Sequence, residues 1–162
     1  MDTRSLKKKL TMEDYRKINK THRLSSYQIK VPHWSGTKNI RAPFEAWGQT
    51  PQQRLPWYIA YNVTKHDRQK TFKHANFDHL LDACCGLFAL LSSQFYNNDF
   101  GPGLDFYSVE RRADGMESGI GEYFRVKFPD DWPVDMLYDF DYQKWQVLKS
   151  EPEPFLKYDY TK

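Results

Sequence analysis

The sequence predicts an α+β fold, with a helical core around residues 50–97 and small β elements contributed by the flanks on both sides. Two patterns support this prediction. The most apolar segment, 76–95, spaces its apolar residues as a helix does, whereas 26–31 and 122–128 alternate between apolar and polar residues like half-buried strands. With 162 residues, 40% hydrophobic and 17% aromatic, the chain has enough material for a single domain over residues 1–162.

The N-terminal part is predicted to be a basic arm that leads into a short helix. Residues 1–10 contain a run of three lysines and no apolar stretch, which predicts a flexible, solvated arm. A helix is expected to start at Thr11, because Thr11 can cap it and Asp14 stands three residues later in a capping-box position. After the strand at 26–31, residues 33–47 have the composition of a loop.

Two helix starts are predicted in the middle of the chain. Thr50 can cap a helix, Pro51 suits its first position, and Gln53 can reach back to the cap. Pro56 then interrupts the segment and can begin a new helix. Residues 57–66 are compatible with a strand or a helix by composition; we predict a helix, because the flanking segments have helical patterns.

The clearest element is the helix predicted over 76–95, which Asn76 or Asp78 can cap. Its apolar residues form two stripes, so we expect the helix to lie at the centre of the core. The stripes are Leu80, Cys84, Leu87 and Leu91, and Leu81, Phe88 and Phe95. Gly86, in the middle of the helix, costs about 1 kcal/mol relative to Ala and predicts the close approach of a partner helix.

The segments after this helix are predicted to be shorter and more irregular. They are a glycine-containing connection at 107–121, the strand at 122–128, an acidic turn at 129–133, two short strands at 137–142 and 144–148, and an extended aromatic strap at 151–162.

Charge is distributed unevenly along the chain. Residues 1–80 hold 16 Lys and Arg against 6 Asp and Glu, whereas residues 81–162 hold 8 against 15. Either the basic half faces a polyanion, or the two halves attract each other within one fold. We slightly favour the second interpretation, because no base-reading motif is present.

The cysteines and the lack of long apolar runs predict the cellular compartment of the protein. Cys84 and Cys85 are adjacent, which disfavours a disulfide between them, and we expect both to be buried small hydrophobic residues. This usage predicts a reducing, cytoplasmic location. No apolar leader stands at 1–10, and the longest apolar run, 83–91, is shorter than the about 20 residues of a membrane span, so no membrane contact is predicted.

The candidate catalytic residues are Asn62, Lys65, His66 and Arg68. On a helix, Asn62 and His66 lie one turn apart on one face, with the two cations beside them. An imidazole exchanges protons near neutral pH, cations hold a phosphate, and an amide can orient the imidazole. These groups suffice for metal-free RNA cleavage through the 2′-hydroxyl of the substrate. In the alternative interpretation, Asn62 and His66 only cap the end of the helix or bridge to the next segment, and the two cations are solvated or paired with acids.

No cofactor and no metal are predicted. His66, His74 and His79 are close in sequence, but no cysteine pair or carboxylate stands at ligand spacing beside them. The sequence Gly101-Pro102-Gly103 lacks the Lys-Ser/Thr that would follow in a phosphate-binding loop.

The segment from Pro56 to Arg68 resembles the motif region of HEPN-type domains, which are small helical bundles. It also resembles a pattern in many uncharacterised bacterial proteins: a Pro and a Trp, then Tyr-Asn-x-x-Lys-His-x-Arg, then a long apolar helix. HEPN ribonucleases carry an Arg, usually followed by a polar residue, and then a His four to six residues after the Arg. Here Asn62 matches the polar follower and His66 the histidine, whereas Tyr61 stands in the Arg position.

The resemblance implies a homodimer that cleaves or binds RNA, in a defence or toxin–antitoxin setting. Lys65 and Arg68 beside His66 favour this function. The alternative is a non-catalytic domain for protein–protein interaction, which Tyr61 in the Arg position favours.

Overall fold

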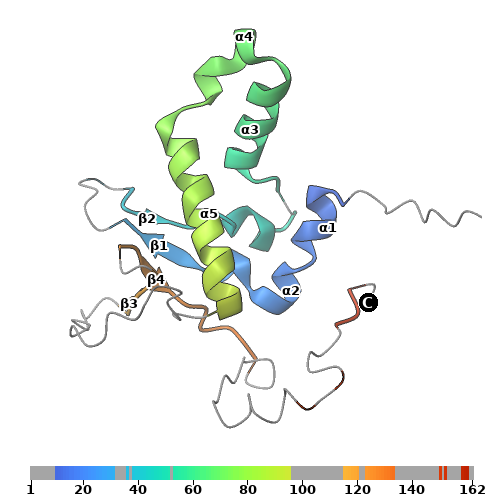
Figure 1. Cartoon of the computed structure of the whole chain (residues 1–162), viewed down its shortest axis with the longest axis vertical. Helices are drawn as coiled ribbons and strands as arrows, with labels where there is room; N and C mark the ends of the chain where they lie inside the picture. The colour runs from blue at the N-terminus through green and yellow to red at the C-terminus, as the bar shows by residue number, and fades with distance from the viewer. Residues whose placement is uncertain are drawn as a thin grey trace, which may run out of the picture. The chain divides into compact units, whose positions relative to one another are not determined.

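The computed structural model describes residues 10–31, 36, 38–51, 53–95, 115–120, 123–133, 150, 152 and 158–160. The fold is α+β, as predicted: helices pack with one four-stranded antiparallel sheet (Figure 1). The chain divides into two units, 1–131 and 132–162, and the elements below belong to the first. The predicted strands at 137–142 and 144–148 lie outside the described residues, as does the basic arm except Leu10. The single domain over 1–162 stays a prediction.

The N-terminal helices begin where the capping chemistry predicts. Helix α1 (Met12–Arg16) follows Thr11, and the carboxylate of Asp14 accepts hydrogen bonds from the Thr11 N–H at 3.0 Å and from its hydroxyl at 2.8 Å. Two short elements follow, α2 (Asn19–His22) and the 3₁₀ helix η1 (Leu24–Ser26). The predicted capping box is therefore confirmed.

The sheet joins the two flanks of the helical core. Its strands are β1 (Gln28–Lys30), β2 (Ile40–Arg41), β3 (Glu117–Ser118) and β4 (Arg125–Lys127), in the order β2-β1-β4-β3. Ile29 of β1 lies opposite Val126 of β4, and both side chains are fully buried. The strands predicted at 26–31 and 122–128 are thus present, and they pair with each other.

A helical hairpin rises from this sheet (Figure 1). Helix α3 (Pro56–His66) runs antiparallel to α5 (Phe77–Phe95), and α4 (Arg68–Thr71) and the 3₁₀ helix η3 (Phe72–His74) connect them. Helix α5 contacts α3, β1, η1 and α2, which makes it the central element of the unit. The helix predicted at 57–66 is confirmed.

The capping and close-packing predictions for α5 are also confirmed. The Asn76 side-chain oxygen accepts a hydrogen bond from the His79 N–H at 2.9 Å, which caps the helix. Gly86 packs against the Trp57 ring of α3, so another helix lies beside it as predicted, although a Cβ at Gly86 would make only an ordinary contact of 3.4 Å with that ring.

Two predictions before α3 are wrong. No helix starts at Thr50, because the residue before a proline disfavours the helical conformation, and Leu55 is extended with φ −69° and ψ 121°. The helix starts at Pro56 instead. The predicted loop at 33–47 contains β2 and the start of the 3₁₀ helix η2 (Glu45–Gly48), because Ile40 and Arg41 pair with β1.

Only one side of α5 is buried. Leu81, Cys85 and Ala89 are buried, whereas Leu80 and Leu87 are 58% and 59% exposed. The predicted central position in the core therefore holds for one face of the helix. Among the described residues, no helix combines the length and apolar character needed to cross a bilayer.

The two cysteines differ in their surroundings. Cys85 is buried, and burial raises the pKa of its thiol to about 12. Cys84 is exposed, so the prediction that both cysteines are buried is wrong for Cys84. The reason is geometric, since adjacent residues on a helix point about 100° apart.

Candidate nucleic-acid interface

A groove of about 730 Å³ lies between α3 and the first turns of α5, and the α4–η3 connection closes one end. It is lined by Trp57, Ala60, Tyr61, Thr64, Lys65, Arg68, Phe72, His74, Ala75, Asn76, Phe77, His79, Leu80 and Ala83. The indole N–H of Trp57 donates to the Pro43 carbonyl at 2.8 Å, which fixes the ring between α3 and the segment after β2.

Three aromatic side chains of the groove are unusually exposed. Tyr61, Phe72 and Phe77 are 55%, 60% and 59% exposed. Aromatic side chains of this size gain most from burial, so a group of exposed rings around one groove marks a surface that can cover a planar ligand.

Positive charge borders the same groove. Lys65 and Arg68 line it and are exposed, and within the described ranges neither forms an ion pair with a carboxylate. The Lys65 ammonium lies 5.7 Å from the centroid of the Tyr61 ring. The nearby acid Asp67 accepts a hydrogen bond from the Lys70 N–H and so caps α4. The cations of the groove are thus available to an anionic ligand.

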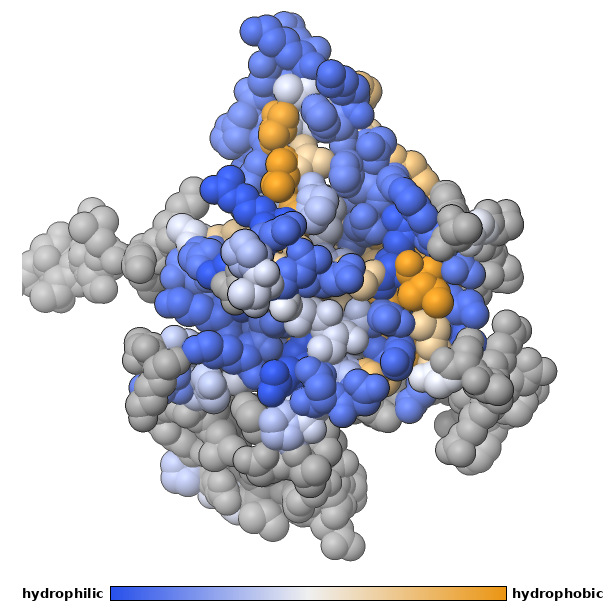
Figure 2. Space-filling view, turned by 180° about the vertical axis from the view of Figure 1, so that it is seen from behind, coloured by the Kyte–Doolittle hydropathy of each residue, from blue (hydrophilic) through white to orange (hydrophobic). Residues whose placement is uncertain are grey.

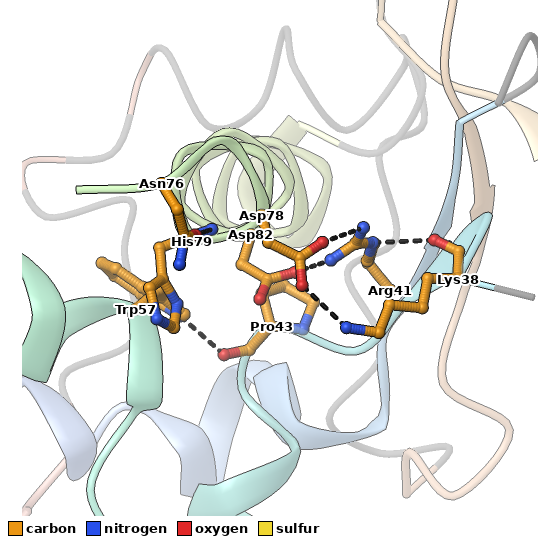
Figure 3. Close-up of polar contacts among 8 residues, drawn as sticks. All are labelled: Lys38, Arg41, Pro43, Trp57, Asn76, Asp78, His79 and Asp82. Carbon is orange, nitrogen blue, oxygen red and sulfur yellow. Dashed lines mark hydrogen bonds and ion pairs between the residues drawn. The ribbon is translucent and has the colours of Figure 1, made fainter. Parts of the chain in front are cut away.

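Two buried polar atoms on groove-lining residues lack hydrogen-bond partners. They are the Thr64 hydroxyl oxygen and Nδ1 of His79, each without a partner in the part of the chain that the structure describes. Figure 3 shows His79 projecting from α5 beside Trp57. Buried polar atoms are usually paired, so these two atoms are exceptions, and they lie beneath the surface of a groove that is mostly apolar.

The structure divides the four residues predicted to act together. Lys65 and Arg68 line the groove, whereas Asn62 lines a separate cavity of about 550 Å³ between α1 and α3. His66 is exposed at the end of α3 and lines neither cavity. The helix predicted for this segment is present, but it turns Asn62 away from the groove. The catalytic roles of the four residues stay a prediction.

Sequence reasoning missed the aromatic side of the groove. Tyr61 and Lys65 lie one turn apart on α3, and this spacing could have indicated their shared position, whereas Arg68 follows the break at Asp67 and belongs to α4. Phe72 and Phe77 come from the chain after it reverses direction, so no local spacing connects them to α3.

A second polar cluster holds the sheet to α5 (Figure 3). The buried guanidinium of Arg41 donates to Asp78 at 2.7 Å, to Asp82 at 2.9 Å and to the Lys38 carbonyl at 2.8 Å. The Lys38 ammonium also donates to Asp78 at 2.8 Å, and these hydrogen bonds from Lys38 and Arg41 lower the pKa of Asp78 to about 2. The Arg41–Asp82 pair crosses from the basic to the acidic half of the chain, whereas the Arg41–Asp78 pair lies within the basic half. Both interpretations of the charge asymmetry stay predictions.

Neither the groove nor the Arg41 cluster offers a metal site. Within the described ranges, no three His, Cys, Asp or Glu side chains are grouped so that they could hold a metal ion. Seen from behind the view of Figure 1, the described residues are mainly hydrophilic, with apolar residues in separate patches (Figure 2).

No protein family, curated protein or solved structure matches this chain. The fold and the groove define an α+β protein that presents an aromatic, basic groove between two antiparallel helices. The HEPN-like arrangement of the helices stays a prediction.

Proposed function

We propose that the groove between α3 and α5 binds single-stranded RNA. The observation that carries this proposal is that exposed aromatic rings and unpaired cations line the same groove. Proteins that bind single strands combine these two features, because bases stack on aromatic rings while cations follow the phosphates. Paired bases in a duplex are not free to stack on protein side chains, so the groove favours a single strand.

Each wall of the groove has a part in this function. Tyr61 and Phe72 present rings for stacking, and Lys65 and Arg68 lie beside them for phosphate contacts. The α4–η3 connection adds the exposed cations Lys70 and Lys73, which extend the positive surface beyond the groove.

Binding, rather than cleavage, is the activity that the groove supports best. RNA cleavage was expected from Asn62 and His66 acting with Lys65 and Arg68, but Asn62 lines a different cavity from the cations. Cleavage, and the defence or toxin–antitoxin setting that the resemblance implies, stay predictions.

Fluorescence anisotropy with a labelled single-stranded RNA tests the proposal. We expect binding to the single strand and weaker binding to the same RNA as a duplex; a matched single-stranded DNA shows whether the sugar is distinguished. Phe72→Ala removes an exposed ring and should lower the affinity about 5-fold or more, because stacking contributes about 1–3 kcal/mol per base.

Arg54→Ala is the matched control, because it removes an exposed cation that lines the other cavity. It should leave the affinity nearly unchanged. Absence of binding at low salt, or equal losses for Phe72→Ala and Arg54→Ala, would overturn the proposal.

A further inference from the structure

The cavity of about 550 Å³ between α1 and α3 has no part in the proposed RNA binding, and we call it the α1–α3 cavity. Helix α3 turns one face to each hollow: Tyr61 and Lys65 line the groove, whereas Ile59 and Asn62 line the α1–α3 cavity. The two hollows share no lining residue. The volume of the cavity lies within the range of about 300–1,000 Å³ that is usual for small-molecule sites.

The inner wall of the α1–α3 cavity is apolar and fixed. Trp47 and Leu55 line it and are only 4% and 1% exposed. The Gln53 N–H donates a hydrogen bond to the Ala46 carbonyl at 3.2 Å, and the Leu55 carbonyl accepts one from the Ile59 N–H at 3.0 Å. These bonds hold the segment before α3 against both η2 and α3, so a ligand would meet a preformed wall.

Two further apolar side chains of the α1–α3 cavity stay exposed. Ile59 and Val63 lie one turn apart on α3, and they are 42% and 37% exposed. An apolar group in the cavity would cover both, and the burial of apolar surface is favourable. The half-buried Tyr58 ring lines the same cavity and favours a flat group, because aromatic rings pack well face to edge or in offset stacks.

Polar side chains with free hydrogen-bonding capacity border this apolar surface. Within the described ranges, the side chains of Gln53, Arg54 and Asn62 have no hydrogen-bond or ion-pair partner. The other cation of the cavity, Arg16, pairs with Glu13 on α1. Arg54 therefore supplies an unpaired positive charge, and the two amides supply N–H donors beside it.

We propose that the α1–α3 cavity binds a small aromatic carboxylate. A guanidinium holds a carboxylate through two parallel hydrogen bonds, so Arg54 binds the charged end, and the amide of Asn62 donates to the same group. The flat apolar end covers Ile59 and Val63. A cationic ligand would meet the unpaired charge of Arg54, and a neutral one would leave that charge without a partner.

This site goes beyond RNA binding and does not rest on it, because the groove and the α1–α3 cavity have separate linings. It also gives a ligand contact to Asn62, which α3 turns away from the groove.

Isothermal titration calorimetry with two probes of the same shape tests the proposal on the full chain. Indole-3-acetate carries the carboxylate, and indole-3-acetamide is its neutral counterpart. We expect indole-3-acetate to bind at one site per chain and indole-3-acetamide to bind about 10-fold more weakly or worse, because hydrogen bonds to charged groups contribute about 1.5–3 kcal/mol. Equal affinities for the two probes, or no binding of indole-3-acetate at millimolar concentration, would overturn the proposal.

Variants on the two faces of α3 locate the bound probe. Arg54→Ala should lower the affinity for indole-3-acetate about 10-fold, since it removes the partner of the carboxylate. Lys65→Ala is the matched control, because it removes an exposed cation of the groove and should leave the affinity unchanged. A loss with Lys65→Ala that equals or exceeds the loss with Arg54→Ala would place the probe in the groove and overturn the assignment.

Filling the α1–α3 cavity gives a test that is independent of charge. Val63→Trp places a large ring in the cavity and should abolish the binding of indole-3-acetate. Circular dichroism checks that the variant is folded. A folded Val63→Trp variant that binds the probe as the wild type does would contradict binding in this cavity.

Discussion

Arg41 of β2 donates a hydrogen bond to Asp82 of α5 at 2.9 Å, and this contact ties the sheet to the helical hairpin. Arg41 is only 6% exposed. Replacing it leaves Asp82 without its ion partner, so Arg41→Ala should lower the free energy of unfolding by about 3 kcal/mol, measured by urea denaturation. Arg54→Ala, at an exposed position, should change it by less than about 0.5 kcal/mol. Similar losses in both variants would contradict this role of Arg41.

The same cluster makes the stability depend on pH. Hydrogen bonds from Lys38 and Arg41 lower the pKa of Asp78 from 3.8 to about 2. A carboxyl group with a lower pKa in the folded state stabilises the fold above its unfolded pKa, and this contribution is lost as the pH falls from about 4 to about 2. The urea midpoint of the wild type should fall across this window, and that of Asp78→Asn should fall less. If both midpoints change in parallel, Asp78 is not the group responsible.

Two buried glycines should respond in opposite ways to the same substitution. A Cβ at Gly86 would make ordinary contacts of 3.4 Å or more, so Gly86→Ala should stabilise α5 by up to about 1 kcal/mol. A Cβ at Gly119 would overlap the Phe88 ring and lie 2.9 Å from Val126, so Gly119→Ala should destabilise the fold by about 1–3 kcal/mol. Thermal unfolding measures both changes. A stable Gly119→Ala variant would contradict this packing between β3 and α5.

The salt dependence of RNA binding reports the phosphate contacts of the groove. Each cation that pairs with a phosphate of a single strand contributes about 0.7 to the slope of log affinity against log salt concentration. Lys65→Ala and Arg68→Ala should each reduce the slope by roughly this amount, and Lys20→Ala, on the N-terminal helix α2, should leave it unchanged. Anisotropy titrations at several salt concentrations measure the slopes. A slope that Lys65→Ala and Arg68→Ala leave intact would exclude phosphate contacts by these side chains.

Whether His66 is catalytic can be tested separately from RNA binding. Incubation of total RNA with wild type and with His66→Ala shows whether an imidazole at this position cleaves RNA, since only the wild type should degrade it. The groove variants measure affinity without reference to turnover. Equal decay with both proteins, or none with either, would reject a catalytic His66 and leave RNA binding intact.

The sequence correctly predicted those helix starts that depend on interactions between residues within one turn. Thr11 with Asp14, and Asn76 before α5, are capping patterns that act within one turn. The helix start at Thr50 failed because a stronger local signal follows it: the extended Leu55 before Pro56 ends any helix that begins there.

Local sequence patterns could not predict which faces of the helices other elements cover. Helical spacing shows that Leu80 and Leu87 share a side of α5, but their exposure depends on where β1 and α3 pack, which long-range contacts decide. Likewise, the spacing of Asn62 and His66 is correct for one helix, whereas the groove beside Lys65 exists only because the chain reverses through α4 and η3.

Strand β1, which holds Ile29, and strand β4, which holds Val126, are neighbours in the sheet, and the whole helical hairpin lies between them in the sequence. A single protease cut in the exposed α4–η3 connection would therefore produce two fragments that the strand ladder still holds together. Such a nicked protein would keep its native size in gel filtration and separate only under denaturing conditions. The chain at the tip of the hairpin can therefore be cut, or lengthened by an insertion, while both helices stay attached to the sheet.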